Sequence, residues 1–230
     1  MPKIYAVIPA AGTGSRAGFQ QNKLLQKVGG VPVLKKTVAA FCANEQIACV
    51  LVCANEADRA EISALLSPFA KVKLAEGGAT RTASVKNALG LLAALPCPPD
   101  YVLIHDAARP FVSQKVIGDC IDTVRQFGSA VCALPCTDTA VLAESGFISD
   151  TVERDKLFAL QTPQGFAFAP LYEAYGKITE SDAFTDDSGV YKKYVAPPRL
   201  FAGEKGNIKL TFAEDFQMET YRTGIGTDTH

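Results

Sequence analysis

A glycine-rich stretch near the start of the chain carries two cations and offers the most specific chemistry in the sequence. Residues 9–16 read Pro-Ala-Ala-Gly-Thr-Gly-Ser-Arg, ending at Arg16, and Lys23 follows seven residues later. The stretch comes directly after the apolar run 4–8, which predicts a buried strand. Small residues let backbone N–H groups approach an anion closely, and the two cations add fixed positive charge. The pattern predicts a polyphosphate site at the end of a strand.

Two common nucleotide motifs fit this stretch less well. Gly12, Gly14 and Ala17 match the dinucleotide fingerprint by letter, but that fingerprint also needs an acidic residue about 20 positions further on. The next acidic residue here is Glu45. The P-loop pattern G-x-x-x-x-G-K-[ST] is absent from the sequence. The remaining alternative is a plain glycine-rich turn with surface cations, which the position at the end of a strand disfavours.

The composition is that of an ordinary globular protein. The 230 residues include 48% hydrophobic and 20% charged residues, enough for one domain with a full core. The net charge is −1, so no overall field attracts nucleic acid and any anion site must be local. We find neither a signal peptide nor an apolar run that could span a bilayer. We therefore expect one domain over residues 1–230, cytoplasmic, with no nucleic-acid or membrane partner.

The seven cysteines indicate a reducing compartment rather than a disulfide framework. Their number is odd, and Cys49, Cys53 and Cys132 lie inside apolar runs, as small core residues do. A zinc site is not expected, because the chain has only His105 and His230 and no paired C-x-x-C. The same scarcity of histidine argues against a Cys–His nucleophile.

Apolar runs alternate with helical patterns along the chain. Helices are predicted after Pro32, over residues 82–95, and from a cap at Ser113 to a stop at Gly128. Strands are predicted between them, at residues 47–53, 72–74, 101–105 and 130–134. This alternation predicts an α/β fold with a doubly wound, mostly parallel sheet. Ligands of such sheets bind at the carboxyl ends of the strands, where the glycine-rich stretch should lie.

One stretch departs from the alternation. Residues 137–144 and 147–154 are short runs rich in Thr, Val and Ile, and Ser145 and Gly146 join them, so they predict a β-hairpin. A solitary hairpin is marginally stable in water, and its apolar side chains need a partner surface. Two interpretations stay open: the hairpin extends the main sheet, or it forms an arm that crosses to a second subunit.

Further segments place polar groups beside apolar runs. The small-residue loop 77–84 opens a helix, and its backbone amides could meet a base or a phosphate. The segment 105–110, His-Asp-Ala-Ala-Arg-Pro, offers the Asp106 carboxylate to a metal or a hydroxyl and the Arg109 guanidinium to a phosphate. Residues 207–211 read as a strand-like run with one lysine. Each segment alone is a weak signal, because a lone Arg or Lys is usually a solvated surface group.

Together these segments resemble the 2-C-methyl-D-erythritol 4-phosphate cytidylyltransferase family over nearly the whole chain. Enzymes of this family join methylerythritol 4-phosphate to CTP, giving 4-diphosphocytidyl-methylerythritol and pyrophosphate, in the non-mevalonate route to isoprenoid precursors. The resemblance implies a nucleotidyltransferase with a Rossmann-like sheet. The matching segments follow one order: PAAGTGSR, Lys23, the loop 77–85, HDAARP, Thr137-Asp138-Thr139, TVER, LQTPQ, TDDSGV and NIKLT.

The resemblance also implies roles at matching positions. Arg16 and Lys23 are the catalytic cations on the CTP triphosphate, and Arg154 and Lys209 position the methylerythritol phosphate. Mg²⁺ is held mainly by the CTP phosphates, with Asp106 as its protein contact. The residues that would hold the nucleotide are Ala10, Ala11, Gly12, Gly14, Gly78, Ser84 and Asp106. Those that would contact the sugar alcohol, the ribose or the metal are Asp106, Arg109, Thr139 and Thr162.

The family works as a homodimer, and its hairpin arm carries the positions of Thr139 and Arg154 into the neighbour's site. The arm interpretation, over residues 137–154, is therefore favoured. Two positions depart from the family pattern. Asn22 precedes Lys23 where proline is frequent, and we expect it to loosen the loop. Ala79 stands where an acidic residue is common, which puts one base or ribose contact in question.

Two other functions stay open on the sequence alone. One is a sibling transferase for another polyol phosphate, such as ribitol 5-phosphate, which would differ in the residues on the acceptor side. The other is a binding module that keeps a nucleotide site without catalysis. The presence of Lys23, Arg154 and Lys209 argues against the binding module, since a pure binder need not keep both donor and acceptor cations.

Overall fold

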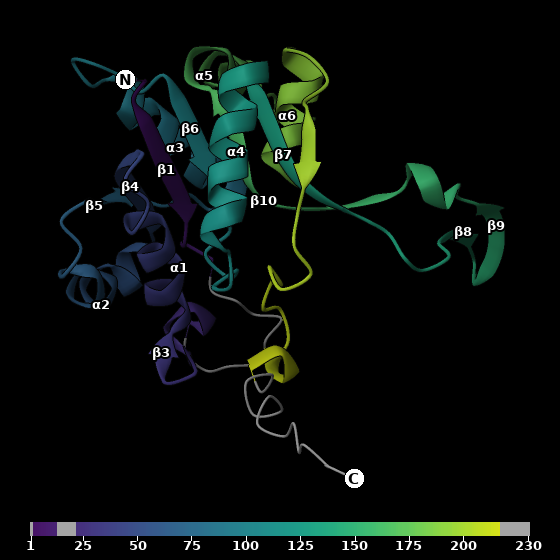
Figure 1. Cartoon of the computed structure of the whole chain (residues 1–230), viewed down its shortest axis with the longest axis horizontal. Helices are drawn as coiled ribbons and strands as arrows, with labels where there is room; N and C mark the ends of the chain where they lie inside the picture. The colour runs from purple at the N-terminus through teal and green to yellow at the C-terminus, as the bar shows by residue number, and fades with distance from the viewer. Residues whose placement is uncertain (1, 13–21, 217–230) are drawn as a thin grey trace, which may run out of the picture.

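A seven-stranded sheet forms the centre of the part of the chain that the computed structural model describes, residues 2–12 and 22–216 (Figure 1). The strand order is β11–β7–β10–β6–β1–β4–β5, and every neighbouring pair in it is parallel except the two that involve β10. The expected doubly wound, mostly parallel sheet is confirmed. Its strands are β1 (Ile4–Pro9), β4 (Ile47–Ala54), β5 (Val72–Glu76), β6 (Tyr101–Ile104), β7 (Ser129–Pro135), β10 (Phe158–Ala167) and β11 (Leu200–Ala202).

Helices cover both faces of this sheet. They are α1 (Val33–Cys42), α2 (Glu56–Leu66), α3 (Arg81–Ala93), α4 (Gln114–Phe127), α5 (Phe168–Gly176) and α6 (Asp187–Tyr194). Apolar side chains of α1, α2 and α4 form one buried cluster, and those of α3, α5 and α6 form the other. Strand β1 serves both clusters, because Ala6 and Ile8 point into the first and Val7 into the second, as the period of two in a strand requires. Within the described residues, no helix is long and apolar enough to cross a bilayer.

The helix signals in the sequence correspond to real ends. Pro32 stands immediately before α1, the Ser113 hydroxyl accepts a hydrogen bond from the Val116 N–H at the start of α4, and Gly128 follows its last residue. The sequence analysis missed α2, α5, α6, β10 and β11. In β10 the reason is Pro163, since a proline argues against a central strand. Pairing of β10 with β7 is interrupted between Leu160 and Gln164, so Pro163, which has no N–H to donate, falls in a gap of the ladder.

Two strand predictions need correction. Residues 207–211 are not a strand: they cross the carboxyl ends of the sheet, and bonds to separate segments hold them, among them the Leu210 N–H to the Ala108 carbonyl at 2.8 Å and Asn207 Nδ2 to the Thr162 carbonyl at 2.7 Å. The second run of the hairpin ends at Thr151, and Arg154 instead begins a short 3₁₀ turn, η3 (Arg154–Lys156). A second such turn, η2 (Lys23–Leu25), precedes a small two-stranded sheet of β2 (Lys27–Val28) and β3 (Val31–Pro32).

The hairpin is present and stands away from the main sheet (Figure 1). Strands β8 (Val141–Glu144) and β9 (Phe147–Thr151) pair only with each other, so the interpretation in which they extend the main sheet is wrong for the described chain. Ser145 and Gly146 have φ of 51° and 85°, the positive values that a tight hairpin turn requires. Phe147 and Ile148 are 79% and 71% exposed. The arm therefore presents apolar side chains that its own chain does not cover.

The loops after β1 and β5 touch at Gly77. Its N–H donates to the Ala54 carbonyl at 2.8 Å, and a Cβ placed on it would lie 2.2 Å from the Ala11 Cβ and 3.1 Å from the Ala54 oxygen. The Ala11 Cβ and the Ala54 oxygen are both fixed by the backbone, so neither can move aside by a change of side-chain rotamer. Glycine at this position therefore keeps the two loops in contact.

We predict that Gly77→Ala lowers the free energy of unfolding by about 1–3 kcal/mol, because the added methyl group overpacks two fixed segments. The melting temperature should fall by about 2–4 °C per kcal/mol. The matched control is Gly118→Ala inside α4, where a Cβ meets nothing within 4 Å. That change should raise stability by up to about 1 kcal/mol through helix propensity. Equal effects of the two substitutions would contradict the close approach.

Candidate active site

Two adjoining pockets lie at the carboxyl ends of β1, β5 and β6. The first has a volume of about 240 Å³ and is lined by Pro9, Ala11, Gly12, Lys23, Leu24, Gly78, Ala79, Thr80, Arg81, Ser84, Asp106, Ala107, Ala108 and Lys209. The second has a volume of about 350 Å³ and is lined by Arg81, Asp106, Arg109, Leu160, Gln161, Thr162, Gln164, Thr185, Asp186 and Lys209. Arg81, Asp106 and Lys209 line both, so these three side chains mark the boundary between the pockets.

Asp106 is the centre of charge at this boundary. Its Oδ1 lies 3.1 Å from Arg81 Nε, and its Oδ2 lies 2.8 Å from Lys209 Nζ and 3.7 Å from Arg109 Nε. Burial alone would raise the pKa of the Asp106 carboxyl, but the charges of Arg81, Lys209 and Arg109 outweigh it and hold the pKa well below its usual value. Asp106 is therefore a carboxylate that gathers three cations from three separate segments.

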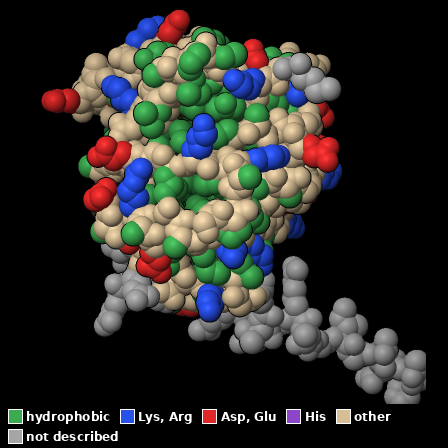
Figure 2. Space-filling model, turned by 90° about the vertical axis from the view of Figure 1, so that its left-hand side faces the viewer, with side chains coloured by type: hydrophobic (Ala, Val, Ile, Leu, Met, Phe, Trp, Pro, Cys, Tyr) green, Lys and Arg blue, Asp and Glu red, His purple; other side chains and the backbone are tan. Residues whose placement is uncertain are grey.

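On the face seen in Figure 2, positive charge is not concentrated in one patch. This face, which carries the β5 edge of the sheet, shows Lys and Arg interspersed with Asp, Glu and apolar side chains. This agrees with the net charge of −1. Attraction for an anion is thus local to the pockets.

Lys23 enters the first pocket from η2. Its Nζ donates a hydrogen bond to the Leu210 carbonyl at 2.9 Å, which joins the turn after the glycine-rich stretch to the segment that carries Lys209. The preceding Asn22 is 8% exposed; its Oδ1 accepts from the Leu24 N–H at 3.0 Å and its Nδ2 donates to Asp58 at 2.7 Å. Asn22 therefore fastens the turn that presents Lys23, while the preceding loop, which we expected it to loosen, lies outside the described residues.

His105 and Thr162 fix the backbone beside Asp106. The His105 ring is fully buried, with Nε2 3.2 Å from the Arg109 carbonyl and Nδ1 3.0 Å from the Thr162 hydroxyl. Because a carbonyl can only accept, Nε2 carries the proton and Nδ1 accepts the proton of Thr162. The Thr162 oxygen in turn accepts from the Asp106 N–H at 3.0 Å. Burial lowers the pKa of His105 to about 4, which agrees with a neutral ring.

Comparisons with known proteins agree with one family. The family model described as "IspD: 2-C-methyl-D-erythritol 4-phosphate cytidylyltransferase" matches residues 4–221. The chain belongs to this family. A curated relative of that name from Bacillus cereus is 37% identical over 213 residues, which cover 91% of this chain and 92% of the relative. The resemblance inferred from nine short segments is therefore confirmed.

Solved structures of the cytidylyltransferase family share the fold. A 4-diphosphocytidyl-2C-methyl-D-erythritol synthase from Anaerococcus prevotii superimposes with a TM-score of 0.83 at 26% identity, covering 94% of each chain. The 2-C-methyl-D-erythritol 4-phosphate cytidylyltransferase from Thermus thermophilus gives 0.74 at 31% identity, covering 94% of this chain and 96% of its own. The nucleotidyltransferase sheet predicted above is thus the family's fold.

The structure brings together most of the site residues expected from the family pattern. The first pocket is lined by Ala11, Gly12, Lys23, Gly78, Ser84, Asp106 and Lys209, and the second by Asp106, Arg109, Thr162 and Lys209. Ala10 is 1% exposed and does not line either pocket. Ser84 shapes the loop, since its hydroxyl accepts from the Gly78 N–H at 2.9 Å. Arg16 and Gly14 lie outside the described residues.

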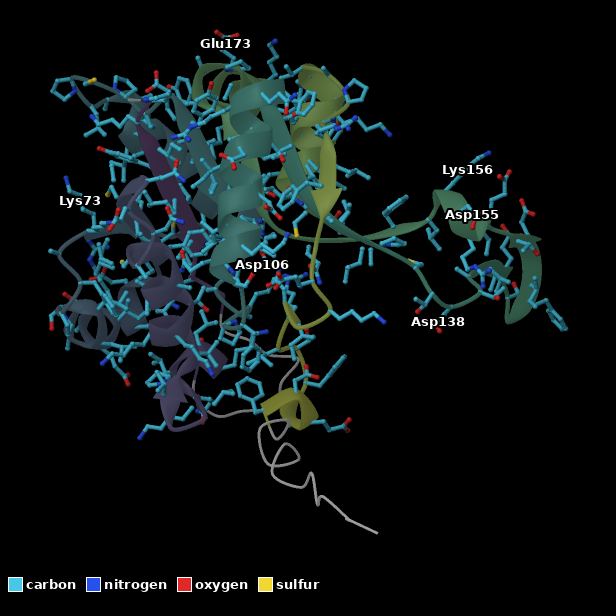
Figure 3. All side chains as sticks on the ribbon, in the orientation of Figure 1. Lys73, Asp106, Asp138, Asp155, Lys156 and Glu173 are labelled. Carbon is cyan, nitrogen blue, oxygen red and sulfur yellow. The ribbon has the colours of Figure 1, made fainter. Side chains whose placement is uncertain are left out.

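Thr139 and Arg154 lie on the arm, outside both pockets of their own chain. Both are exposed, in the described segment that leads into β8 and in η3. Figure 3 shows their neighbours Asp138 and Asp155 well away from Asp106. If these residues serve a site of this kind, it is not the one formed by the rest of the same chain.

Sequence reasoning missed several residues around the second pocket. Arg81 was part of a recognised loop but received no role, although it lines both pockets and contacts Asp106. Thr185 and Asp186, in the matching segment TDDSGV, also line the second pocket. The available signal was the segment itself, since Thr185 and Asp186 stand directly before a short helix and predict a cap: Asp186 accepts from the Gly189 N–H at 3.0 Å.

We predict that Thr162→Val lowers the free energy of unfolding by about 1–3 kcal/mol, because it leaves the Asp106 N–H and His105 Nδ1 buried without partners. Thr162→Ser keeps the hydroxyl and should lose less. Chemical denaturation measures the difference, and ¹⁵N NMR of the His105 ring should report the Nε2-protonated tautomer in the wild type and in Thr162→Ser. A valine variant as stable as the serine variant would contradict the network.

Proposed function

We propose that this chain transfers the cytidylyl group of CTP to 2-C-methyl-D-erythritol 4-phosphate, releasing pyrophosphate, as a step of the non-mevalonate route to isoprenoid precursors. Family membership supports the activity. The observation that carries it in the structure is the Asp106 cluster at the boundary of two pockets. Two anionic substrates that react with each other need a cation between them, and the cluster holds Lys209 there.

The chemistry needs charge and alignment rather than a nucleophilic side chain. A phosphate oxygen of the acceptor attacks the α-phosphorus of CTP in line; a new P–O bond forms, the bond to the β-phosphate oxygen breaks, and pyrophosphate leaves with that electron pair. The acceptor phosphate is largely ionised at neutral pH, so no general base is required. This agrees with a His105 ring whose two nitrogens are both used within the protein. Positioning and electrostatic stabilisation dominate such transfers.

The two pockets suit the two substrates. In this proposal CTP occupies the first pocket, with its base beside Gly78 and Ser84 and its triphosphate beside Lys23 and Arg16. The methylerythritol phosphate occupies the second, beside Arg109 and Thr185. Lys209 lines both pockets and would hold the attacking phosphate close to the α-phosphorus.

A magnesium ion fits the donor side. Within the described residues no group of three or more His, Cys, Asp or Glu could hold a metal, and Asp106 is the carboxylate that lines the first pocket. Mg²⁺ at nucleotide sites uses one or two carboxylates and completes its coordination with phosphates and water. Asp106 would hold it, and the ion would neutralise charge on the CTP phosphate oxygens. In this proposal the phosphates of the nucleotide supply most of the ligands of the ion.

We also propose that the protein is a cytoplasmic homodimer whose arm completes the partner's second pocket. The exposed Phe147 and Ile148 supply an apolar surface for a second copy. Arg154 would then add its positive charge to the second pocket of the partner, since it lies outside the second pocket of its own chain. All seven cysteines lie in the described part of the chain and are free thiols, as in a reducing compartment.

We predict that the purified protein releases pyrophosphate from CTP and Mg²⁺ when methylerythritol 4-phosphate is added, and at most about a hundredth as fast with ribitol 5-phosphate. A coupled assay for pyrophosphate measures both rates. A faster reaction with ribitol 5-phosphate would make the sibling transferase the correct assignment. No release with either acceptor would favour a binding module.

Lys23→Ala serves as the loss-of-function control for this assay. Removing one preorganised charge donor costs on the order of 10²–10³ in kcat. The variant should keep its melting temperature within a few degrees. A rate close to that of the wild type would show that Lys23 does not act on the triphosphate.

We predict that mixing two inactive variants, Lys23→Ala and Arg154→Ala, restores activity after subunit exchange. If Arg154 serves the partner's site, a mixed dimer has one site with both changes and one site with neither. Random exchange makes half of the dimers mixed, with one of two sites intact, so about a quarter of the wild-type rate should return. If both residues serve one chain, no rate returns; that result, with exchange confirmed by mass spectrometry, would overturn the shared site and leave the reaction itself in place.

A further inference from the structure

A buried network that begins at the pockets contains residues with no role in the proposed reaction. Asp187, in the first turn of α6, has a fully buried side chain. Its Oδ2 accepts from Arg81 Nη2 at 2.7 Å, and its Oδ1 accepts from the Tyr175 hydroxyl at 2.5 Å. Burial and the negative charge of Asp187 raise the pKa of Tyr175 well above its usual value, so Tyr175 keeps the proton that it donates.

This network is a rigid anchor. A carboxylate removed from water is costly unless a cation and hydrogen-bond donors satisfy it, and losing one partner leaves that cost uncompensated. Tyr175 comes from α5, Asp187 from α6 and Arg81 from the start of α3, so three helices on one face of the sheet meet at one carboxylate. The helices therefore fix the place of the Arg81 guanidinium.

Arg81 connects the anchor to the site. With Nη2 on Asp187, its Nε is directed at Asp106 Oδ1, 3.1 Å away. A guanidinium is planar, so fixing one of its edges also fixes the direction of the other nitrogens, whereas a lysine ammonium has no such constraint. The negative charges of Asp187 and Asp106 overcome the effect of burial and raise the pKa of Arg81. The guanidinium thus spans two carboxylates, one inside the protein and one between the pockets.

The constraint continues to Lys209. The second oxygen of Asp106 lies 2.8 Å from Lys209 Nζ, and Lys209 comes from a segment without regular secondary structure. The Lys209 side chain is 39% exposed, so it relies on Asp106 for its direction. An alternating series of charges therefore runs from the interior of the protein, through Asp187, Arg81 and Asp106, to Lys209.

We infer that Arg81 is a positioning residue for the transfer reaction: it holds the Asp106 carboxylate, and through it the Lys209 ammonium, in place between the two pockets, and Asp187 and Tyr175 are its buried anchor. This inference rests on the proposed function, because Lys209 is expected to hold the acceptor phosphate. Two other roles give different results in experiments. Arg81 could touch a substrate directly, or the network could serve stability alone.

A double-mutant cycle separates these roles. Steady-state kinetics are measured for the wild type, Arg81→Lys, Asp106→Asn and the double variant, varying methylerythritol 4-phosphate. Arg81→Lys should lower kcat/KM for that substrate at least about 10-fold, with KM for CTP changed less than about 3-fold. If Arg81 acts through Asp106, the double variant should be no more than about 3-fold worse than Asp106→Asn alone. Fully multiplicative losses would mean an independent contact with substrate and would overturn the inference.

The anchor is tested by variants away from the pockets. Asp187→Asn should reproduce the loss of Arg81→Lys, and Tyr175→Phe, which removes one hydrogen bond from Asp187, should give a smaller loss in the same direction. Arg125→Lys is the matched control, since Arg125 donates to Gln46 on the surface and should leave kcat/KM unchanged. Lower melting temperatures with kcat/KM unchanged in the anchor variants would mean that the network is structural, which would also overturn the inference.

A measurement without turnover keeps the inference separate from the proposed function. If the wild type releases no pyrophosphate, the proposed function fails, and crystal structures of the wild type and Arg81→Lys without substrate still test the positioning. The variant should show the Asp106 carboxylate rotated and its contact with Lys209 lost. An unchanged Asp106–Lys209 contact would show that Arg81 does not position either residue.

Discussion

The site depends on holding like charges close together before any anion arrives. Two unit charges 4 Å apart interact by about 4 kcal/mol near a protein surface, so Arg81, Arg109 and Lys209 would separate without a counter-charge. Asp106 supplies it with both carboxylate oxygens. The sheet places this carboxylate centrally, because β6 ends immediately before His105 and lies between β1 and β10. Asp106 lines both pockets, so this one carboxylate forms part of the boundary between them.

The Asp106 carboxylate can gather these cations only if its own position is fixed. Two sets of hydrogen bonds fix it. The His105 ring and the Thr162 hydroxyl fix its backbone, and they can do so because the ring is neutral and each of its nitrogens has a single partner. Arg81 fixes its side chain from the opposite direction. The histidine in this segment is therefore used for its geometry, as a spacer between the two ends of the loop, and its burial removes it from acid–base chemistry.

Local patterns in the sequence were sufficient for much of the fold and for part of the site. Apolar runs predicted five of the parallel strands, since each run carries its own period and end signals.

Strand β10 was missed because Pro163 and its polar neighbours are unusual in a central strand. Only the pairing with β6 and β7, which no local pattern reveals, makes this segment a strand. Residues 207–211 were predicted as a strand from composition, but their path is set by bonds to separate segments, at Ala108, Arg109 and Thr162. Arg81 and Asp187 are 106 positions apart in the sequence, so no local pattern could reveal their contact. The bond from Asn22 to Asp58 likewise joins residues 36 positions apart.

The single antiparallel strand also determines where the chain tolerates change. Because β10 returns beside β7, with Phe158 opposite Pro135, the sheet is already closed beneath the arm by pairing at its base. The arm is thus an insertion between β7 and β10, and the pairing of these two strands does not depend on the arm. Since the entropy of closing a loop grows slowly with its length, segments of quite different size can be grafted onto this base at little cost to the sheet. The catalytic edge can keep one architecture while the surface that meets another chain is remodelled independently.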